Sequence, residues 1–528
     1  MLATLLSATL IGLDGRPIRV EVDVAPGLPG FTIVGLADAA LREARERVRG
    51  AIRNAGFTYP PRRITVNLAP ADLPKAGASV DLAIAIGILL GSEQFRPVGG
   101  RVALIGELGL GGELRPVPGL LPMLAALSRR GVRRAIVPAP AAAEAALVRS
   151  IESSPCGGLA EAVDILRARR RARPAAPARV ALADSEGRGD PLGARDPATA
   201  GDAVPALDGG FPDLAEVRGQ VSARRALEVA LAGGHGLVFI GPPGGGKTLL
   251  ARTIPGLLPA LDDAAALAAT VIASASGEGP VTGLVRRPPV RAPHHTSSYA
   301  AIVGGGPALV PGEVTRADNG VLFLDELPEF DRDVLEALRQ PLEDGHVTIA
   351  RATRAVTFPA RFQLVAAMNP CPCGHAGTPR CSCRPGETDR YLRRISGPLR
   401  DRVDIWAWMP QVRARSIVGT EEPEASTVVA ARIARARAIQ MARSPGQLNS
   451  RVGGRALREA CDLSTAVRSR TVALAEAEGL SGRGTDRLLR VARTIADLGA
   501  SPRVEAEHVD EAARWRAPGS RASLALAS

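Results

Sequence analysis

The sequence predicts an α/β protein in which a phosphate-loop core lies between a second α/β domain and a carboxyl-terminal helical domain. The first observation is Gly-Pro-Pro-Gly-Gly-Gly-Lys-Thr at residues 241–248, which meets the pattern G-x-x-x-x-G-K-[ST] at every fixed position. The second is the alternation of short apolar runs with amphipathic runs over residues 1–165. The third is the helical spacing of apolar residues over residues 425–516.

Composition places the domain boundaries. Residues 166–206 are rich in Arg, Ala, Pro, Gly and Asp, which is typical of a flexible linker. We therefore expect an amino-terminal domain over 1–165, the linker over 166–206 and the phosphate-loop core over 207–415. A helical domain over 416–516 and a tail over 517–528 complete the chain.

The charge balance indicates a polyanionic partner. The 528 residues include 66 Lys plus Arg against 54 Asp plus Glu, which gives a net charge of +12. Nucleic acid is the favoured partner, ahead of a membrane, and the alternative is an arginine-rich solvated surface. No apolar stretch reaches the roughly 18 residues that a membrane span needs, and no basic leader precedes a cleavage site. We expect a cytoplasmic protein that does not contact a membrane.

The phosphate loop has the local context that its chemistry requires. An apolar strand is predicted over 236–240 and a helix from residue 249, so backbone N–H groups at a helix N-terminus would hold the phosphates. Lys247 would reach the β- and γ-phosphates of a nucleotide triphosphate, and the Thr248 hydroxyl would ligate Mg²⁺. Only two of the 66 basic residues are lysines, Lys75 and Lys247, and this position needs a compact ammonium. The predicted nucleotide-binding residues of the loop are Gly241, Pro242, Pro243, Gly244, Gly245, Gly246, Lys247 and Thr248.

Two carboxylates follow a second apolar strand at residues 320–324. Asp325 would hold Mg²⁺ through water, and Glu326 would polarise the water that attacks the γ-phosphate. Surface acids are common at strand ends, so the prediction depends on the phosphate loop upstream.

Four of the six cysteines lie within residues 371–383, as two C-x-C pairs separated by seven residues. Cys371, Cys373, Cys381 and Cys383 could form a tetrahedral zinc site. The spacing is tighter than the usual C-x₂₋₄-C, and simple reduced thiols are the alternative.

Residues 207–415 resemble the AAA+ ATPases in several further segments. Residues 213–220 resemble the segment that contacts the nucleotide base and contain Gly219 and Gln220, and Asn369, at the end of a third apolar strand, matches the sensor-1 position. The arginine-finger segment is matched by residues 395–404, which implies Arg402 as the finger, with Arg400 as the alternative. A finger given to the neighbouring subunit implies a ring. The sensor-2 position is matched by Arg483, with Arg487 as the alternative.

A β-rich segment at residues 346–358 predicts a hairpin with an Arg-x-x-Arg tip. In AAA+ proteins with a helix-2 insert and a pre-sensor-1 hairpin, such a hairpin points into the central channel. The resemblance implies that Arg351 and Arg354 face DNA phosphates. The alternative is a solvated hairpin tip.

The amino-terminal domain resembles Lon-type Ser–Lys peptidase domains, which have the ribosomal S5 domain 2-like fold. Ser79 falls on the nucleophile position, but Leu121 occupies the position of the catalytic lysine. Lys75 does not match that position, and a serine without a base is not activated. We therefore expect a Lon-like fold without peptidase activity.

Nearly the whole chain resembles the Mg-chelatase-like YifB/ComM family of bacterial AAA+ ATPases. The matching segments include residues 33–38, 319–330, 369–374 and 493–498. The resemblance implies a homo-hexameric ATP-driven motor that migrates DNA branches in natural transformation. The alternative is a magnesium-chelatase-type motor that remodels a protein partner for metal insertion. The departures from the family are the long linker and the glycines on both sides of Arg483.

Overall fold

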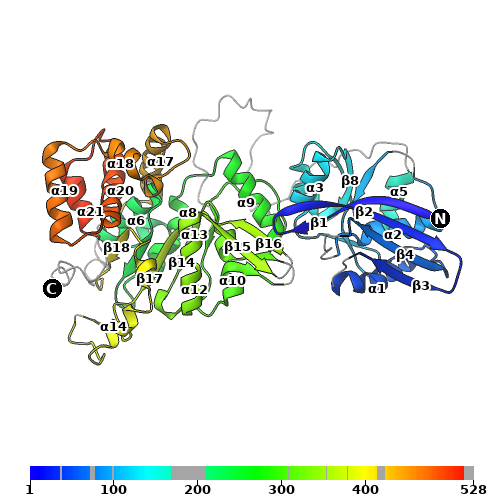
Figure 1. Cartoon of the computed structure of the whole chain (residues 1–528), viewed down its shortest axis with the longest axis horizontal. Coiled ribbons are helices and arrows are strands. Elements are labelled where there is room, and N and C mark those ends of the chain that lie inside the picture. Colours follow the sequence, from blue (N-terminus) through cyan, green and yellow to red (C-terminus); the bar gives the residue numbers. More distant parts are fainter. Residues whose placement is uncertain are drawn as a thin grey trace, which may run out of the picture. The chain divides into compact units, whose positions relative to one another are not determined.

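The computed structural model describes residues 1–35, 39–71, 78–97, 100–167, 210–306, 309–351, 354–376, 378–412 and 423–515. These residues form two compact units (Figure 1). The first unit is Met1–Gly210 together with Ala273–Leu284, and the second is Phe211–Ile272 together with Val285–Ser528.

The first unit contains a seven-stranded mixed sheet in the order β3-β4-β2-β1-β5-β8-β9. Strand β2 pairs antiparallel with both β1 and β4, and every other pairing in the sheet is parallel. The strands are β1 (Leu2–Ile11), β2 (Asp14–Ala25), β3 (Gly30–Val34), β4 (Arg63–Ala69), β5 (Val102–Leu104), β8 (Arg134–Pro138) and β9 (Glu152–Cys156). A small separate pair consists of β6 (Glu107–Leu108) and β7 (Leu114–Arg115).

The helices of this unit cover the sheet. They are α1 (Ala39–Asn54), α2 (Asp81–Gly91), α3 (Leu120–Arg129), α4 (Ala142–Ala146) and α5 (Leu159–Arg167). The near-uniformly apolar sequence of residues 81–90 predicts a buried helix, and α2 confirms it, since all its residues except Leu90 are buried. Apolar residues of α2 join those of β2 and β4 in one hydrophobic core.

One ion pair is buried where α1 meets α2. The Arg47 guanidinium donates to the Asp81 carboxylate, with Nε 2.8 Å from Oδ2. Burial raises the pKa of Asp81 to about 6, and the hydrogen bond from Arg47 opposes that rise. Removing the Arg47 guanidinium would leave the fully buried Asp81 carboxylate without its ion-pair partner, so the pair helps to fix how the two helices meet.

The second unit is built on a five-stranded, fully parallel sheet in the order β11-β14-β17-β10-β18. Its strands are β10 (Leu237–Ile240), β11 (Val290–Arg291), β14 (Val321–Leu324), β17 (Gln363–Met368) and β18 (Ile405–Trp408). Every residue of β10, β14 and β17 is buried, as expected for parallel strands covered on both faces. Because the strands are parallel, their carboxyl ends meet at one edge, which is where ligands bind in open α/β sheets.

Helices and two hairpins surround this sheet. The hairpins are β12 (Gly304–Gly305) with β13 (Val310–Pro311), and β15 (His346–Arg351) with β16 (Arg354–Pro359). The helices are α6 (Val221–Gly233), α7 (Lys247–Arg252), α8 (Ile254–Leu257), α10 (Tyr299–Val303), α11 (Glu313–Arg316), α12 (Arg332–Ala337), α13 (Arg339–Asp344), α14 (Glu387–Leu392) and α15 (Gly397–Arg400). Helix α9 (Asp263–Ser276) belongs to this unit up to Ile272, and its last residues belong to the first unit.

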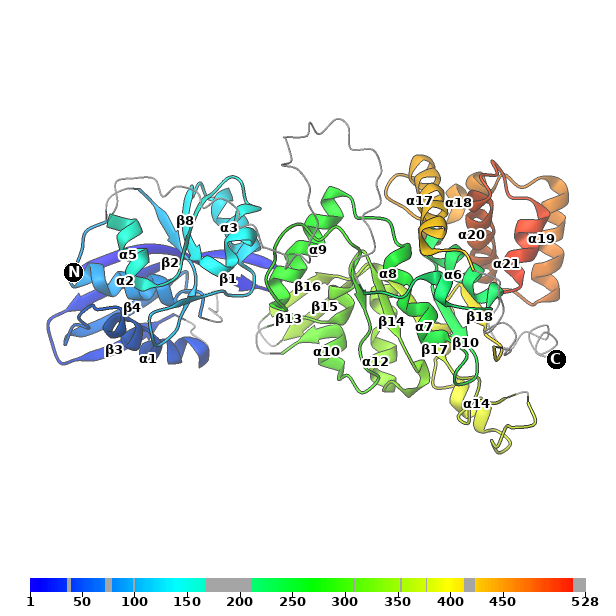
Figure 2. The same ribbon diagram turned by 180° about the vertical axis from the view of Figure 1, so that it is seen from behind.

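The carboxyl-terminal residues form the helical domain that the sequence predicts. Its helices are α17 (Ser426–Arg443), α18 (Gly454–Cys461), α19 (Thr465–Ala477), α20 (Gly482–Leu498) and α21 (Ala506–Ala513). Helices α17 and α20 pack against α6 (Figure 2). Their buried residues belong to the same hydrophobic core as the parallel sheet, so the helical domain is continuous with the phosphate-loop core.

A buried polar network joins the two parts. The ring of His235 is fully buried before β10, with Nδ1 3.0 Å from Oδ2 of Asp404 and Nε2 2.8 Å from Oγ1 of Thr494. Thr494 lies on α20 and Asp404 directly precedes β18, so this histidine links the helical domain to the parallel sheet. Among the helices within the described ranges, none combines the length and apolarity of a membrane span.

Candidate functional site

The phosphate loop lies between β10 and α7, at the carboxyl edge of the parallel sheet. Gly246 precedes α7 with φ of 85°, a left-handed conformation that favours glycine. This turn lets the chain enter the helix with its first N–H groups free of intrahelical partners. The loop therefore has the backbone geometry of an anion site, as the sequence predicts.

Lys247 is anchored within the loop and against a neighbouring strand. Its Nζ donates to the carbonyl oxygens of Gly241 at 2.7 Å and Pro242 at 2.9 Å, and to Oδ1 of Asn369 at 3.0 Å. Burial lowers the pKa of Lys247, and the negative charges of Asp325 and Glu326 oppose this. The Lys247 ammonium is thus held by two carbonyl oxygens of the phosphate loop and lies within the electrostatic influence of two carboxylates.

The predicted magnesium ligands are in contact. The Thr248 hydroxyl donates to Oδ2 of Asp325 at 2.7 Å, although 77 residues separate them. A hydroxyl and a carboxylate at the end of β14 are hard oxygen ligands, which fit Mg²⁺. Thr248 and Asp325 would hold the ion, and it would supply charge neutralisation for the phosphates.

The strand order explains why Asn369 belongs to this group. Strand β17 lies between β10 and β14, so the residue after its end lies between Lys247 and Asp325. The amide Oδ1 accepts from Lys247, which leaves the amide NH₂ for a water or phosphate oxygen.

Glu326 has a strained backbone. Its φ of 54° is left-handed, which is uncommon for a residue other than glycine, and such strain clusters at functional sites. The Glu326 N–H donates to Oδ1 of Asp325 at 3.0 Å. The Asp325 carboxylate thus contacts the Thr248 hydroxyl and the backbone of Glu326, whereas the Glu326 carboxylate contacts His295.

His295 is a site residue whose role the sequence does not reveal. Its Nδ1 lies 3.3 Å from Oε2 of Glu326, and its ring stacks on His294 with centroids 4.2 Å apart. The neighbouring His294 instead contacts Thr296 Oγ1 at 2.8 Å. In the sequence, the adjacent histidines are compatible with a metal or phosphate contact or with a hydrogen-bonded loop, and only the folded chain selects Glu326 as the partner of His295.

Gly219 and Gln220 lie beside the phosphate loop. Both have positive φ, 68° and 53°, and Gln220 precedes α6. The Gln220 amide donates to the carbonyl oxygens of Gly245 at 3.0 Å and Pro410 at 2.7 Å. Gln220 therefore ties the phosphate loop to the segment after β18.

The four arginines that are candidates for the finger or for sensor 2 have different surroundings. Arg487 is engaged with the backbone, since its Nη1 donates to the carbonyl oxygens of Asp401 at 3.0 Å and Val403 at 3.2 Å. Arg402 forms an ion pair with Glu343, and burial lowers its pKa together with the positive charges of Arg483, Arg339 and Arg487. Arg483 is exposed at the start of α20.

The candidate finger Arg402 and the candidate sensor-2 residue Arg483 influence each other electrostatically. The charge of Arg483 acts on Arg402, whereas the pKa of Lys247 responds to Asp325 and Glu326. Arg400, the alternative finger, contributes its carbonyl oxygen to Arg487 at 3.5 Å.

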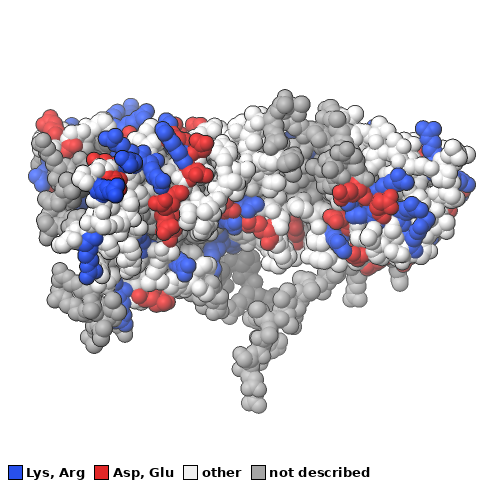
Figure 3. All heavy atoms as spheres, turned by 90° about the horizontal axis from the view of Figure 1, so that it is seen from below, with Lys and Arg blue, Asp and Glu red and all other residues white. Residues whose placement is uncertain are grey.

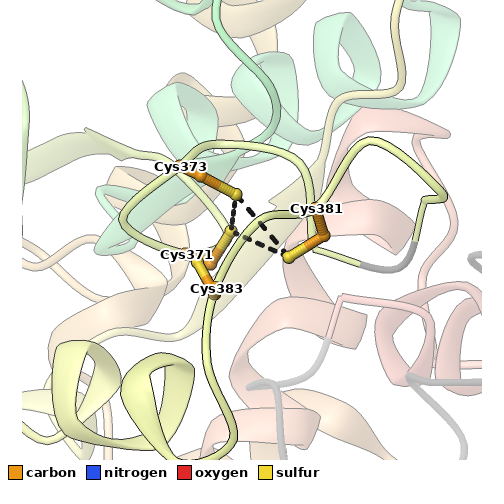
Figure 4. Close-up of side chains that lie close together, drawn as sticks. All are labelled: Cys371, Cys373, Cys381 and Cys383. Carbon is orange, nitrogen blue, oxygen red and sulfur yellow. Dashed lines mark hydrogen bonds between the residues drawn. The ribbon is translucent and has the colours of Figure 1, made fainter.

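The four clustered cysteines converge in space (Figure 4). Their sulfur atoms all lie within 4.8 Å of one another, with Cys371 Sγ 3.3 Å from that of Cys373 and Cys373 Sγ 3.6 Å from that of Cys381. Backbone N–H groups of His375 and Ser382 lower the pKa of Cys373 to about 5, which favours a thiolate. Four sulfur ligands at this spacing fit a tetrahedral zinc ion.

The remaining predicted residues are the hairpin arginines and the positions that resemble a Lon-type peptidase site. The backbones of Arg351 and Arg354 pair at the end of the β15–β16 hairpin, but their side chains and the tip itself lie outside the described residues. Lys75 also lies outside them. Ser79 is buried and its hydroxyl donates to the carbonyl oxygen of Ala8 at 2.9 Å, while Leu121 is 3 % exposed.

The positive charge is not gathered into one broad field on the face drawn in Figure 3. Basic and acidic residues are interspersed over both the helical domain and the first unit. The net charge of +12 therefore does not by itself locate a polyanion site.

Comparison with known proteins places these features in a family. Residues 20–141 match the model described as subunit ChlI of Mg-chelatase, residues 213–417 match magnesium chelatase, subunit ChlI, and residues 423–516 match its C-terminal region. The chain is 40% identical to competence protein ComM of Haemophilus influenzae, over 98% of this chain and 97% of that protein. It is 40% identical to uncharacterized protein YifB of Escherichia coli, over 96% of this chain and 95% of the relative. It is 42% identical to uncharacterized protein Rv2897c of Mycobacterium tuberculosis, over 98% of each.

Proposed function

The chain belongs to the Mg-chelatase-like YifB/ComM family of AAA ATPases, and on that premise we propose that it is an ATP-hydrolysing ring motor that translocates on DNA. The observation that carries the ATPase part is the contact set of Lys247, Thr248, Asp325 and Asn369 at one sheet edge. The DNA part is supported by the arginine-ended β15–β16 hairpin and by the relative named competence protein.

The proposed chemistry uses each site residue in a distinct role. Lys247 and the loop N–H groups bind and orient the β- and γ-phosphates. Glu326 accepts a proton from the attacking water, and Asn369 orients that water. Arg402 would stabilise charge on the nucleotide of a neighbouring subunit in a homo-hexameric ring, and Arg483, whose charge lowers the pKa of Arg402, would contact the γ-phosphate.

The amino-terminal unit has, in this proposal, a Lon-like fold and no peptidase activity. Ser79 has its hydroxyl committed to a backbone carbonyl, and the apolar Leu121 stands where Lon-type peptidases carry the lysine. A serine nucleophile needs a base within hydrogen-bond reach, so neither residue supports acyl transfer.

The second candidate is a motor that remodels a protein partner for metal insertion. It is favoured by the three family models, all of which describe magnesium chelatase subunit ChlI. Response to DNA separates the two candidates.

We expect single-stranded or branched DNA to stimulate ATP hydrolysis by the full chain. The Arg351→Glu/Arg354→Glu variant should lose this stimulation and keep its basal rate, because reversed charges at the hairpin end repel phosphates. Steady-state hydrolysis with and without each DNA measures the effect. Arg458→Glu/Arg468→Glu, two exposed arginines of the helical domain, is the matched control. A wild-type rate that DNA leaves unchanged excludes the DNA motor and leaves the chelatase-type motor.

We expect His295→Ala to lower kcat several-fold while KM for ATP stays unchanged. His295 contacts the acid of Glu326, so in this proposal it positions the general base and does not bind phosphate. His294→Ala should retain the wild-type kcat because its ring contacts Thr296. Equal losses in the two variants would show that the stacked pair acts structurally.

We expect the purified protein to contain one zinc per chain, bound by the four cysteines. The Cys373→Ser/Cys381→Ser variant should lose the metal, whereas Cys156→Ala, at a buried cysteine of the first unit, should retain it. Elemental analysis after gel filtration measures the content. Protein purified without chelators that holds no zinc would instead support simple reduced thiols.

A further inference from the structure

The first unit contains an open pocket of about 690 Å³ that the proposed function does not use. Five arginines line it, and we call it the arginine pocket. The volume is within the roughly 300–1,000 Å³ of small-molecule sites, so the hollow is large enough to hold a ligand. Its lining arginines are Arg16, Arg19, Arg101, Arg129 and Arg130.

Three elements bring these arginines together. Arg16 and Arg19 lie on β2, Arg129 ends α3, and Arg101 directly precedes β5. Gly15 allows the close approach of β2 and α3, because a Cβ there would overlap the backbone of Pro122 and Met123. The spacing of the arginines is therefore set by the packing of the sheet and helix.

The charge of the arginine pocket is unbalanced. None of the described residues that line it is acidic. Arg16 and Arg19 pair with Asp14 and Glu21, which stand outside the lining. Among the residues that the structure describes, the guanidinium groups of Arg101, Arg129 and Arg130 have no hydrogen-bond or ion-pair partner. Three exposed guanidinium groups without acidic partners, placed around one hollow, produce a positive potential that attracts an anion.

The interior of the pocket is apolar. The partly exposed side chains of Leu6, Pro17 and Ala69 line it, whereas the lining residues Ile18 and Leu127 are fully buried. A free inorganic anion would leave this apolar surface unused. A ligand that carries phosphates beside flat heterocycles would use both parts, since guanidinium planes also stack on bases.

We propose that the arginine pocket binds single-stranded DNA, with the arginines on the phosphodiester backbone and a base against the apolar interior. The proposal rests on the DNA-motor function and adds a second DNA contact, in a different unit from the β15–β16 hairpin. Single-stranded rather than duplex DNA fits, because only unpaired bases can enter a hollow, while a duplex presents phosphates on a convex surface.

The test is binding of a fluorescently labelled oligo(dT) to the full chain, by anisotropy over a series of salt concentrations. The variant is Arg101→Glu/Arg129→Glu/Arg130→Glu. The control is Arg53→Glu/Arg62→Glu/Arg149→Glu, which makes the same charge change at exposed arginines of the same unit outside the pocket. Basal ATP hydrolysis and the thermal unfolding midpoint check that each variant folds.

We expect the pocket variant to bind at least about tenfold more weakly, while the control changes binding much less. The slope of log affinity against log salt should fall in magnitude by about 2, since each phosphate contact on a single strand contributes about 0.7. A folding defect would reduce the fraction of active protein without changing this slope.

Three other results overturn the proposal, and each has a distinct meaning. If wild type binds oligo(dT) and the pocket variant binds equally, the pocket is not a DNA contact and the motor function stands. If wild type binds no DNA, the proposed function fails as well. If dTMP binds wild type but not the pocket variant, and oligo(dT) binding is unchanged, the pocket is a mononucleotide site.

Discussion

Lys247→Ala should lower the rate of ATP hydrolysis by about 10²- to 10³-fold, as expected when a preorganised cation facing the transferred phosphoryl group is removed. Its Nζ is held by Gly241, Pro242 and Asn369, so the ammonium is aligned before the nucleotide binds. Steady-state phosphate release measures the loss. ATP binding should weaken as well, because the same ammonium would contact the ground-state phosphates.

The chain offers a direct control for this substitution. Lys75→Ala changes the only other lysine and should retain the wild-type rate. Glu326→Gln should separate binding from chemistry: it removes the general base, lowers kcat by about 10²- to 10⁴-fold and leaves ATP binding intact. Hydrolysis that persists in Lys247→Ala would contradict the assignment of the site.

Arg402→Ala should lower hydrolysis by about 10³-fold or more if it acts as an arginine finger on a neighbouring subunit. Arg402 is paired with Glu343, and among the described residues no hydrogen bond or ion pair joins it to the phosphate loop of its own chain. This arrangement is the one expected of an arginine that acts on the site of another copy.

Mixing two inactive variants tests this action in trans. Arg402→Ala keeps its phosphate loop and Lys247→Ala keeps its finger, so an equal mixture that forms shared rings should recover about one quarter of the wild-type rate, the fraction of interfaces with both parts intact. Light scattering confirms that rings form. No recovery in assembled mixed rings would contradict the trans role of Arg402. If Arg400→Ala is inactive alone and recovers activity when it is mixed with Lys247→Ala, Arg400 is the finger.

The sequence predicted the parts of the site whose signals are contiguous. The phosphate loop needs glycine, lysine and threonine at fixed spacing, because one turn of backbone has to fold around an anion. Asp325 and Glu326 follow an apolar run that could only be a buried strand, and β14 confirms that strand. The helices of the carboxyl-terminal domain were similarly readable from their apolar spacing, since 3.6-residue periodicity is a local property.

Other elements carried no such signal. Strand β1, central in the sheet of the first unit, was not predicted, because its run of Leu and Ala has neither clear alternation nor turn residues at its start. Residues 2–11 are recognised as a strand only from their backbone pairing with β2 and β5. The arginine pocket was equally hidden, since its five arginines come from three separate segments of the chain.

By itself the sequence determined that this protein has a phosphate-loop motif, a strand-end pair of carboxylates and a cysteine cluster, because each is formed by neighbouring residues. Only the tertiary structure decided which distant groups meet: Asn369 with Lys247, His295 with Glu326, and Gln220 with the loop carbonyl of Gly245. Those contacts follow from the strand order β14-β17-β10 and from the loops packed on its edge. That order is set by the burial of apolar surface over the whole unit, which is a sum over many residues and is not encoded at any single position.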